Sequence, residues 1–186
     1  MAELQKSIFP MKDLGISATY NSTSLHKNAS QGSPKSYPTD LCGKDKGKSG
    51  FYAPFDCKVL KVYNKASNGI WLRSSKKVVT PKTPNGAYIF LMLEHPTKLP
   101  KVGQTFKQGE LITYEDAAGN ATGNHIHLEC AYSSSTSVSC YWSKNNRGHW
   151  GLRIGTQMKI EEAFFLDPSF TKVYNDKGVK FKTLTK

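Results

Sequence analysis

The chain has 186 residues and a mass of 20.7 kDa, a length typical of one domain with a sizeable hydrophobic core. Aromatic residues make up 11% of the sequence, which argues against disorder, and no apolar run is long enough to span a membrane. The formal net charge of +12 predicts an anionic partner or surface.

Lysine carries most of this charge. Proteins that read a nucleic-acid sequence favour arginine, whose planar fork pairs with bases, and this chain has only Arg73, Arg147 and Arg153. The composition therefore predicts no nucleic-acid partner and fits diffuse attraction to an anionic wall polymer such as teichoic acid. The alternative is a solvated basic surface with no specific ligand.

The first 14 residues do not resemble a signal peptide. Glu3, Lys6 and Pro10 interrupt this segment, which lacks an apolar core and a small-residue cleavage site. We expect synthesis in a cytoplasm. The four cysteines show no CxxC spacing, so mostly reduced thiols are expected, with a Cys130–Cys140 bridge as the alternative.

Short extended runs alternate with Gly, Pro, Asn and Ser, which predicts a mainly β domain. Residues 21–35 are polar and are expected to form a loop. A hairpin is predicted at Asn68-Gly69, a strong turn signal. The expected strands are residues 16–20, 58–63, 70–74, 88–95 and 111–114, with an extended segment at 37–41.

The composition changes after Tyr132. Residues 133–150 are rich in serine and then in aromatic and basic side chains. Thr156 is a candidate cap for a short helix at 158–165, and a hairpin-like tail is expected around 174–178. We expect residues 1–132 to form the core and residues 133–186 to form a C-terminal loop, short helix and tail packed on it.

The segment from Gly123 to Cys130 predicts a strand with two histidines on one face. Side chains alternate along a strand, so His125, His127 and Glu129 share one side while Ile126 and its alternates face the core. Two adjacent imidazoles suit a divalent metal with a neighbouring proton carrier. The alternative is a pair of ordinary surface histidines.

Five segments in order resemble motifs of the lysostaphin-type zinc peptidases, a family of peptidoglycan endopeptidases, in the variant carried by bacteriophage lysins and tail-tip proteins. The resemblance covers about residues 16–131 and implies an antiparallel β-sheet groove. The segments are Tyr37-Pro38-Thr39-Asp40-Leu41, residues 52–59, Met92-Leu93-Glu94-His95, residues 102–110 and Thr122-Gly123-Asn124-His125-Ile126-His127-Leu128-Glu129.

The resemblance implies a Zn²⁺ cofactor and roles for individual residues. His127 and Asp40 would be zinc ligands, His125 a general base, and His95 a group that stabilises the oxyanion or positions the water. Glu129 would orient one of the histidines or pair with a surface lysine. The alternatives without a catalytic role are that Asp40 caps a turn and that His95 is a hydrogen-bonded structural histidine.

One position departs from the family pattern. The first zinc ligand is usually the histidine of H-x-x-x-D, and Ser36 occupies that position here. His26 lies upstream, and an intervening insertion that returns it to the metal would complete a set of His26, Asp40 and His127. Without His26 the site would keep two protein ligands. His149 is expected to be a loop residue.

Three functions are compatible with these features. The first is a phage-encoded zinc endopeptidase that hydrolyses peptide bonds of bacterial cell-wall peptidoglycan, on the virion or as a lysis enzyme. It would be made in the host cytoplasm and act at the wall, with peptidoglycan, anionic wall polymers and other phage tail proteins as partners. The second is a catalytically degenerate structural tail-tip protein, and the third is a non-catalytic wall-binding module.

Overall fold

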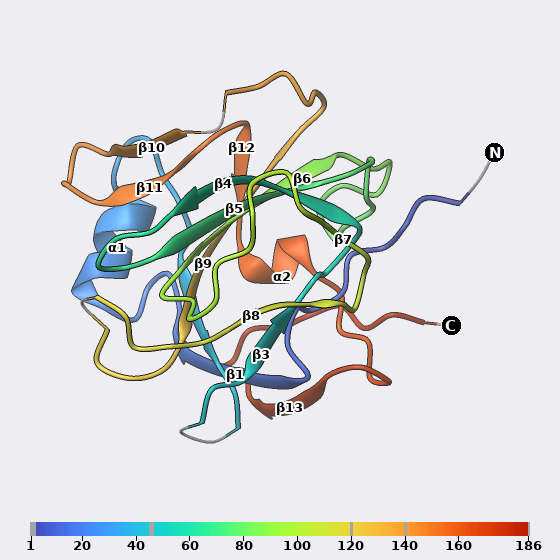
Figure 1. Ribbon diagram of the computed structural model, residues 1–186, viewed down its shortest axis with the longest axis horizontal. Helices are drawn as coiled ribbons and strands as arrows, with labels where there is room; N and C mark the ends of the chain where they lie inside the picture. The colour runs from blue at the N-terminus through green and yellow to red at the C-terminus, as the bar shows by residue number, and fades with distance from the viewer. Residues whose placement is uncertain (1–2, 45–46, 120, 140, 186) are drawn as a thin grey trace.

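The computed structural model describes residues 3–44, 47–119, 121–139 and 141–185, and it confirms the predicted mainly β fold (Figure 1). The described residues hold two short helices, α1 (Ser24–Gln31) and α2 (Ile160–Ala163). No helix in these ranges is both long and apolar enough to cross a membrane.

One large sheet dominates the described part of the chain. Its order is β13-β1-β2-β9-β6-β5-β4-β7, and β12 also pairs with β9. The pairings are antiparallel except for β1 with β13. The strands are β1 (Asp13–Ala18), β2 (Thr39–Cys42), β4 (Cys57–Tyr63), β5 (Gly69–Ser74), β6 (Tyr88–Glu94), β7 (Thr105–Phe106), β9 (Ile126–Ser133), β12 (Thr156–Met158) and β13 (Lys172–Asn175). Two separate pairs complete the set, β3 (Gly50–Tyr52) with β8 (Leu111–Tyr114) and β10 (Tyr141–Lys144) with β11 (Trp150–Arg153).

Strand β9 lies in the middle of the sheet and is buried on both faces. Ile126, Leu128 and Cys130 pack into the main hydrophobic cluster, as the alternation predicts. The other face is also covered, because a second hydrophobic cluster packs Ala131 against Leu152 of β11 and against Ile154, which follows that strand. The sequence predicts one solvent-facing polar side, whereas the β10–β11 hairpin covers part of it.

The polar segment 21–35 is a helix over part of its length, so the expected loop is wrong there. The Thr23 side chain accepts a hydrogen bond from the His26 N–H (3.1 Å) and caps α1. His26, Ala29 and Ser30 are its buried residues, at spacings that place them on one helical face. This segment has too few apolar residues to show the helical repeat in its sequence.

Two C-terminal predictions also need correction. Thr156 lies in β12 and does not cap a helix, since α2 begins later and Glu162 accepts a hydrogen bond from the Lys159 N–H (3.1 Å). The tail does not form a hairpin with its own neighbour, because β13 pairs in parallel with β1. Cys42, Cys57 and Cys130 are free thiols, and Cys140 lies outside the described residues.

The cap on α1 gives a test of local stability. Replacing Thr23 by Ala removes the side-chain acceptor for the His26 N–H, which should destabilise the fold by about 1 kcal/mol. Thr23→Ser keeps a hydroxyl and should retain most of that stability. Urea unfolding of the three proteins measures the difference, and equal midpoints for the Ala and Ser variants would contradict the capping role.

Candidate metal centre

Three potential metal ligands come together from separate elements, because two histidine rings approach the same carboxylate oxygen of Asp40. His26 comes from α1, Asp40 from β2 and His127 from β9. Asp40 Oδ1 lies 3.3 Å from His26 Nε2 and 3.0 Å from His127 Nδ1. Tetrahedral zinc with bonds near 2.0–2.1 Å separates its ligand atoms by about 3.3 Å, and both distances from Asp40 Oδ1 are close to that spacing.

The sheet register brings two of the ligands together. Asp40 is paired directly with His127 in the antiparallel ladder of β2 and β9. Directly opposed residues of such a pair have neighbouring side chains on the same face. The third ligand, His26, is 2% exposed and is held by α1 with its ring 5.2 Å from that of His127, measured between centroids.

The ring of His26 is oriented by a backbone carbonyl. Its Nδ1 lies 2.9 Å from the Thr19 carbonyl oxygen, so Nδ1 carries the proton and donates it. The lone pair of Nε2 therefore faces Asp40. A hydrogen bond at the distal nitrogen is the usual way in which a ligating imidazole is fixed.

Ser36 does not take part in this group. Its side chain is fully buried, and a Cβ placed on Gly151 would come within 2.8 Å of Ser36 Oγ. The position of the family's usual histidine is thus packed closely against β11. The structure brings His26 to Asp40 instead, the arrangement that the expected insertion requires.

The electrostatics of the site favour a cation at its centre. Burial opposes ionisation of Asp40, yet the hydrogen bond from His127, together with the nearby His26, holds the pKa of this carboxyl well below its usual range. Burial also lowers the pKa of His127, but Asp40 and Glu129 outweigh it and raise that pKa to about 10. A proton on His127 thus balances the buried carboxylates, and a divalent metal would replace it.

Two further histidines border the three ligands. His125 Nε2 lies 3.9 Å from Asp40 Oδ1, and the ring centroids of His125 and His95 are 4.8 Å apart. Each ring has its Nδ1 on a carbonyl oxygen, at 2.8 Å from Gly123 for His125 and 2.6 Å from Ala118 for His95. Both Nε2 atoms are therefore free to accept a proton or a hydrogen bond.

His95 is held in an uncommon state. Its φ of +66° lies in the left-handed region, which costs a non-glycine residue free energy. Its N–H donates to the Ser67 carbonyl (2.9 Å), which helps to fix this conformation. Burial, reinforced by the nearby His125, lowers the pKa of His95 to about 4, so the ring is neutral at pH 7.

A second group lies behind His127 and includes a residue that the sequence did not indicate. Glu129 is fully buried, with Oε1 3.6 Å from His127 Nε2 and 3.1 Å from His149 Nε2. Strand alternation predicted Glu129 on the side of His127. His149 lies 20 residues further along the chain, and no sequence signal linked it to this face.

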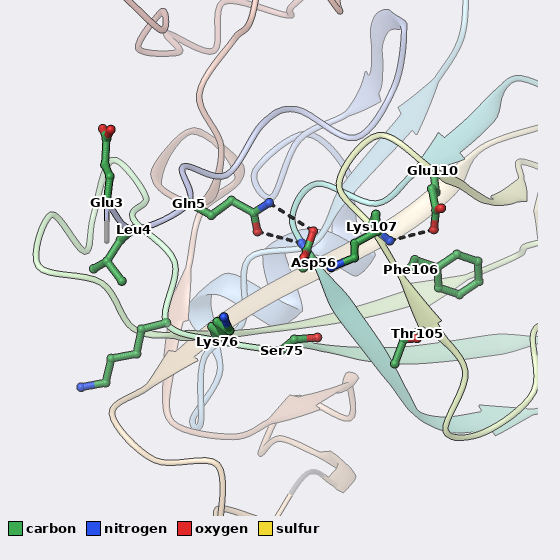
Figure 2. A pocket seen from close by; sticks show the side chains of 11 residues that line it. Glu3, Leu4, Gln5, Asp56, Ser75, Lys76, Thr105, Phe106, Lys107 and Glu110 are labelled. Atoms are coloured by element: carbon green, nitrogen blue, oxygen red, sulfur yellow. Dashed lines mark hydrogen bonds and ion pairs between the residues drawn. The ribbon is translucent and has the colours of Figure 1, made fainter. Parts of the chain in front are cut away.

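One cavity lies away from this centre. It has a volume of about 660 Å³ and includes none of the five candidate histidine and aspartate residues in its lining. Figure 2 shows Gln5 and Lys107 beside Asp56, and Lys107 Nζ lies 2.8 Å from Asp56 Oδ2. Charges of both signs line this cavity and neutralise one another in part.

Sequence comparison finds a phage relative. No family model matches the chain. Morphogenesis protein 1 of Bacillus phage B103 is 30% identical over 181 residues, which cover 97% of this chain and 45% of that protein. The chain therefore spans less than half the length of this curated relative.

Comparison with solved structures shows the fold. A chain of the SpoIIQ–SpoIIIAH pore-forming complex has a TM-score of 0.55 and 12% identity, over 87% of this chain and 92% of that one. A zinc-containing peptidase from Vibrio cholerae has a TM-score of 0.48 and 20% identity, over 80% of this chain and 39% of that one. The catalytic domain of lysostaphin from Staphylococcus simulans has a TM-score of 0.40 and 15% identity, over 71% and 84%.

Metal binding should release a proton from His127. Because Asp40 and Glu129 raise the pKa of His127 to about 10 in the ion-free protein, zinc must displace that proton to reach Nδ1. We expect zinc affinity to rise about tenfold per pH unit between about pH 7 and pH 9. Calorimetric titration in buffers of different ionisation enthalpy counts the protons released, and a count of zero would contradict the assignment.

Proposed function

We propose that this chain is a zinc-dependent endopeptidase that hydrolyses peptide bonds of bacterial cell-wall peptidoglycan. The observation that carries the proposal is the convergence of His26, Asp40 and His127, with their ligand atoms within 4.8 Å of one another. Two imidazole nitrogens and one carboxylate oxygen suit Zn²⁺ and leave a fourth position for water. Zinc bound there supplies a Lewis acid and lowers the pKa of its water to about 7.

His125 is the general base in this proposal. Its Nδ1–H is held by the Gly123 carbonyl, which leaves the Nε2 lone pair beside Asp40 to take a proton from the attacking water. The same nitrogen can then return the proton to the amine that leaves when the peptide bond breaks. The same imidazole therefore takes up the proton and later gives it back, so no second acid is needed.

His95 positions the water in this proposal. A neutral imidazole carries one proton, and the hydrogen bond from Nδ1 to the Ala118 carbonyl uses it. With a pKa near 4, His95 does not gain a second proton at neutral pH, so its Nε2 can accept a hydrogen bond but cannot donate one. Of the two roles that the family resemblance implies, water positioning therefore fits better than oxyanion stabilisation.

A structural role in virion assembly is the second candidate. The name of the phage relative, Morphogenesis protein 1, favours it. The two roles are compatible, since an assembly component that carries a peptidase can act on the wall. We propose that the chain is virion-associated, with other virion proteins and wall peptidoglycan as its partners.

Purified peptidoglycan tests the proposed hydrolysis. Zinc-loaded protein should release new free amino groups and no new reducing ends, and chelation should abolish this release. His125→Ala should bind zinc normally yet lose activity by about 100-fold or more, because it removes the base and no ligand. His127→Ala should lose both zinc and activity.

The controls separate the three candidate functions. A zinc-loaded protein that leaves peptidoglycans of several cross-link types intact, yet sediments with them, would refute the peptidase and favour a wall-binding module. Unchanged activity in His125→Ala would refute the assigned base. A chain that neither cuts nor binds the wall would leave the assembly role.

The basic surface should concentrate the protein on anionic walls. With a formal net charge of +12, binding to sacculi should weaken strongly as salt rises, because exposed charges are screened. Cosedimentation of the His125→Ala variant with sacculi measures this without hydrolysis. Removing teichoic acid from the sacculi should abolish most of the salt dependence, and an unchanged dependence would refute the attraction to that polymer.

A further inference from the structure

The β10–β11 hairpin lies beside helix α1, and no step of the proposed reaction uses it (Figure 1). Its connecting turn, residues 145–149, contacts two of the elements that carry metal ligands. One set of contacts reaches strand β9, which holds His127. The other reaches the end of α1, the helix that holds His26.

The contact with β9 is made through Glu129. His149 Nε2 lies 3.1 Å from Glu129 Oε1, and the Leu152 N–H donates to Glu129 Oε2 over 2.8 Å. Both oxygens of this fully buried carboxylate are thus engaged by the hairpin. Oε1 also lies 3.6 Å from Nε2 of His127, on the edge of the ring opposite Asp40. The hairpin therefore fixes the carboxylate that faces the distal nitrogen of a metal ligand.

The contact with α1 is made through Asn145. Its Nδ2 donates to the Asn28 carbonyl oxygen (2.8 Å), two residues beyond His26 in the same helix. Its Oδ1 accepts from the N–H groups of Arg147 (2.9 Å) and His149 (3.0 Å), which ties the two contacts together. The neighbouring Asn146 exchanges hydrogen bonds with Ser33, at 2.8 and 3.0 Å.

We propose that this turn is a brace for the metal centre, in which His149 and Asn145 are positioning residues. His149 acts on His127 through Glu129, and Asn145 acts on His26 through the backbone of α1. The inference rests on the proposed metal site. Partners behind a ligating imidazole fix its orientation, and losing one typically weakens metal affinity by about 10- to 100-fold.

A second metal ion is the competing explanation for the buried group of His127, Glu129 and His149, whose ligand atoms also lie within 4.8 Å of one another. Both ions would then need His127 at once, one on each ring nitrogen. A neutral imidazole has one lone pair for a metal and keeps a proton on its other nitrogen. The brace therefore predicts one zinc per chain, and a second tight equivalent would overturn it.

The test measures zinc affinity of the purified full chain by competition with a chromophoric chelator. His149→Leu removes the imidazole at similar bulk and should weaken zinc binding by about 10- to 100-fold. His149→Gln keeps an amide donor and should recover part of the loss. Lys144→Ala changes an exposed residue of the same hairpin and should bind zinc like the parent.

Thermodynamic cycles locate the path of each effect. Adding His149→Leu to a Glu129→Gln protein should cause little further loss, because the first change already breaks the link to His127. Adding Asn145→Ala to a His26→Ala protein should likewise cause little further loss. The absorption spectrum of bound Co²⁺ should change in His149→Leu and stay unchanged in Lys144→Ala, since it reports ligand geometry.

The outcomes separate the brace from the proposed catalysis. A folded His149→Leu protein with parental zinc affinity and Co²⁺ spectrum would overturn the brace, as would fully additive losses in both cycles. Should that variant fail to fold, His149→Gln and the Asn145→Ala cycle decide by the same criteria. No step uses peptidoglycan, so a parent that binds zinc but cuts no wall would refute the peptidase and leave this result readable.

Discussion

The carboxylate of Asp40, held between the imidazoles of His26 and His127, is the interaction on which the described site depends. A buried carboxylate is costly unless opposite charge or hydrogen bonds compensate it. Here one oxygen meets two ring nitrogens, at 3.3 and 3.0 Å, while a second buried carboxylate, Glu129, lies on the far side of His127. Either a proton or a metal ion can balance these buried carboxylates, which is why the group suits the proposed metal site.

The architecture explains why this group can persist. The β2–β9 ladder sets Asp40 opposite His127, and the large hydrophobic cluster packs against the other face of β9. The hairpin above β9 adds a smaller cluster and seals Glu129 from water. His26 comes from outside the sheet and depends on a short helix of low hydrophobicity. Its position therefore relies on hydrogen bonds at both ends of α1, from the Thr23 cap and from Asn145.

The strands and the residues on each of their faces could be predicted from the sequence, because side-chain alternation along a strand is a local property. Sequence reasoning placed His125, His127 and Glu129 on one side of β9 and expected an extended segment around Asp40. It missed α1, whose polar residues lack a strong apolar period. It correctly placed His149 in a loop but gave no sign that this side chain is buried against Glu129. It also expected the tail to pair with itself, whereas a parallel partner far along the chain cannot be recognised from neighbouring residues.

The sequence by itself determined the β-rich fold, the basic charge and the chemical identity of the ligands, since these depend on composition and on a period of two residues. Only the tertiary structure decided which histidine meets Asp40 and what lies behind His127. Fourteen positions separate His26 from Asp40, and 20 separate Glu129 from His149. The position of α1 brings His26 to Asp40. The small side chains of Ser36 and Gly151 leave room for the hairpin that brings His149 to Glu129. Both depend on contacts between distant parts of the chain, so no local sequence pattern predicts them.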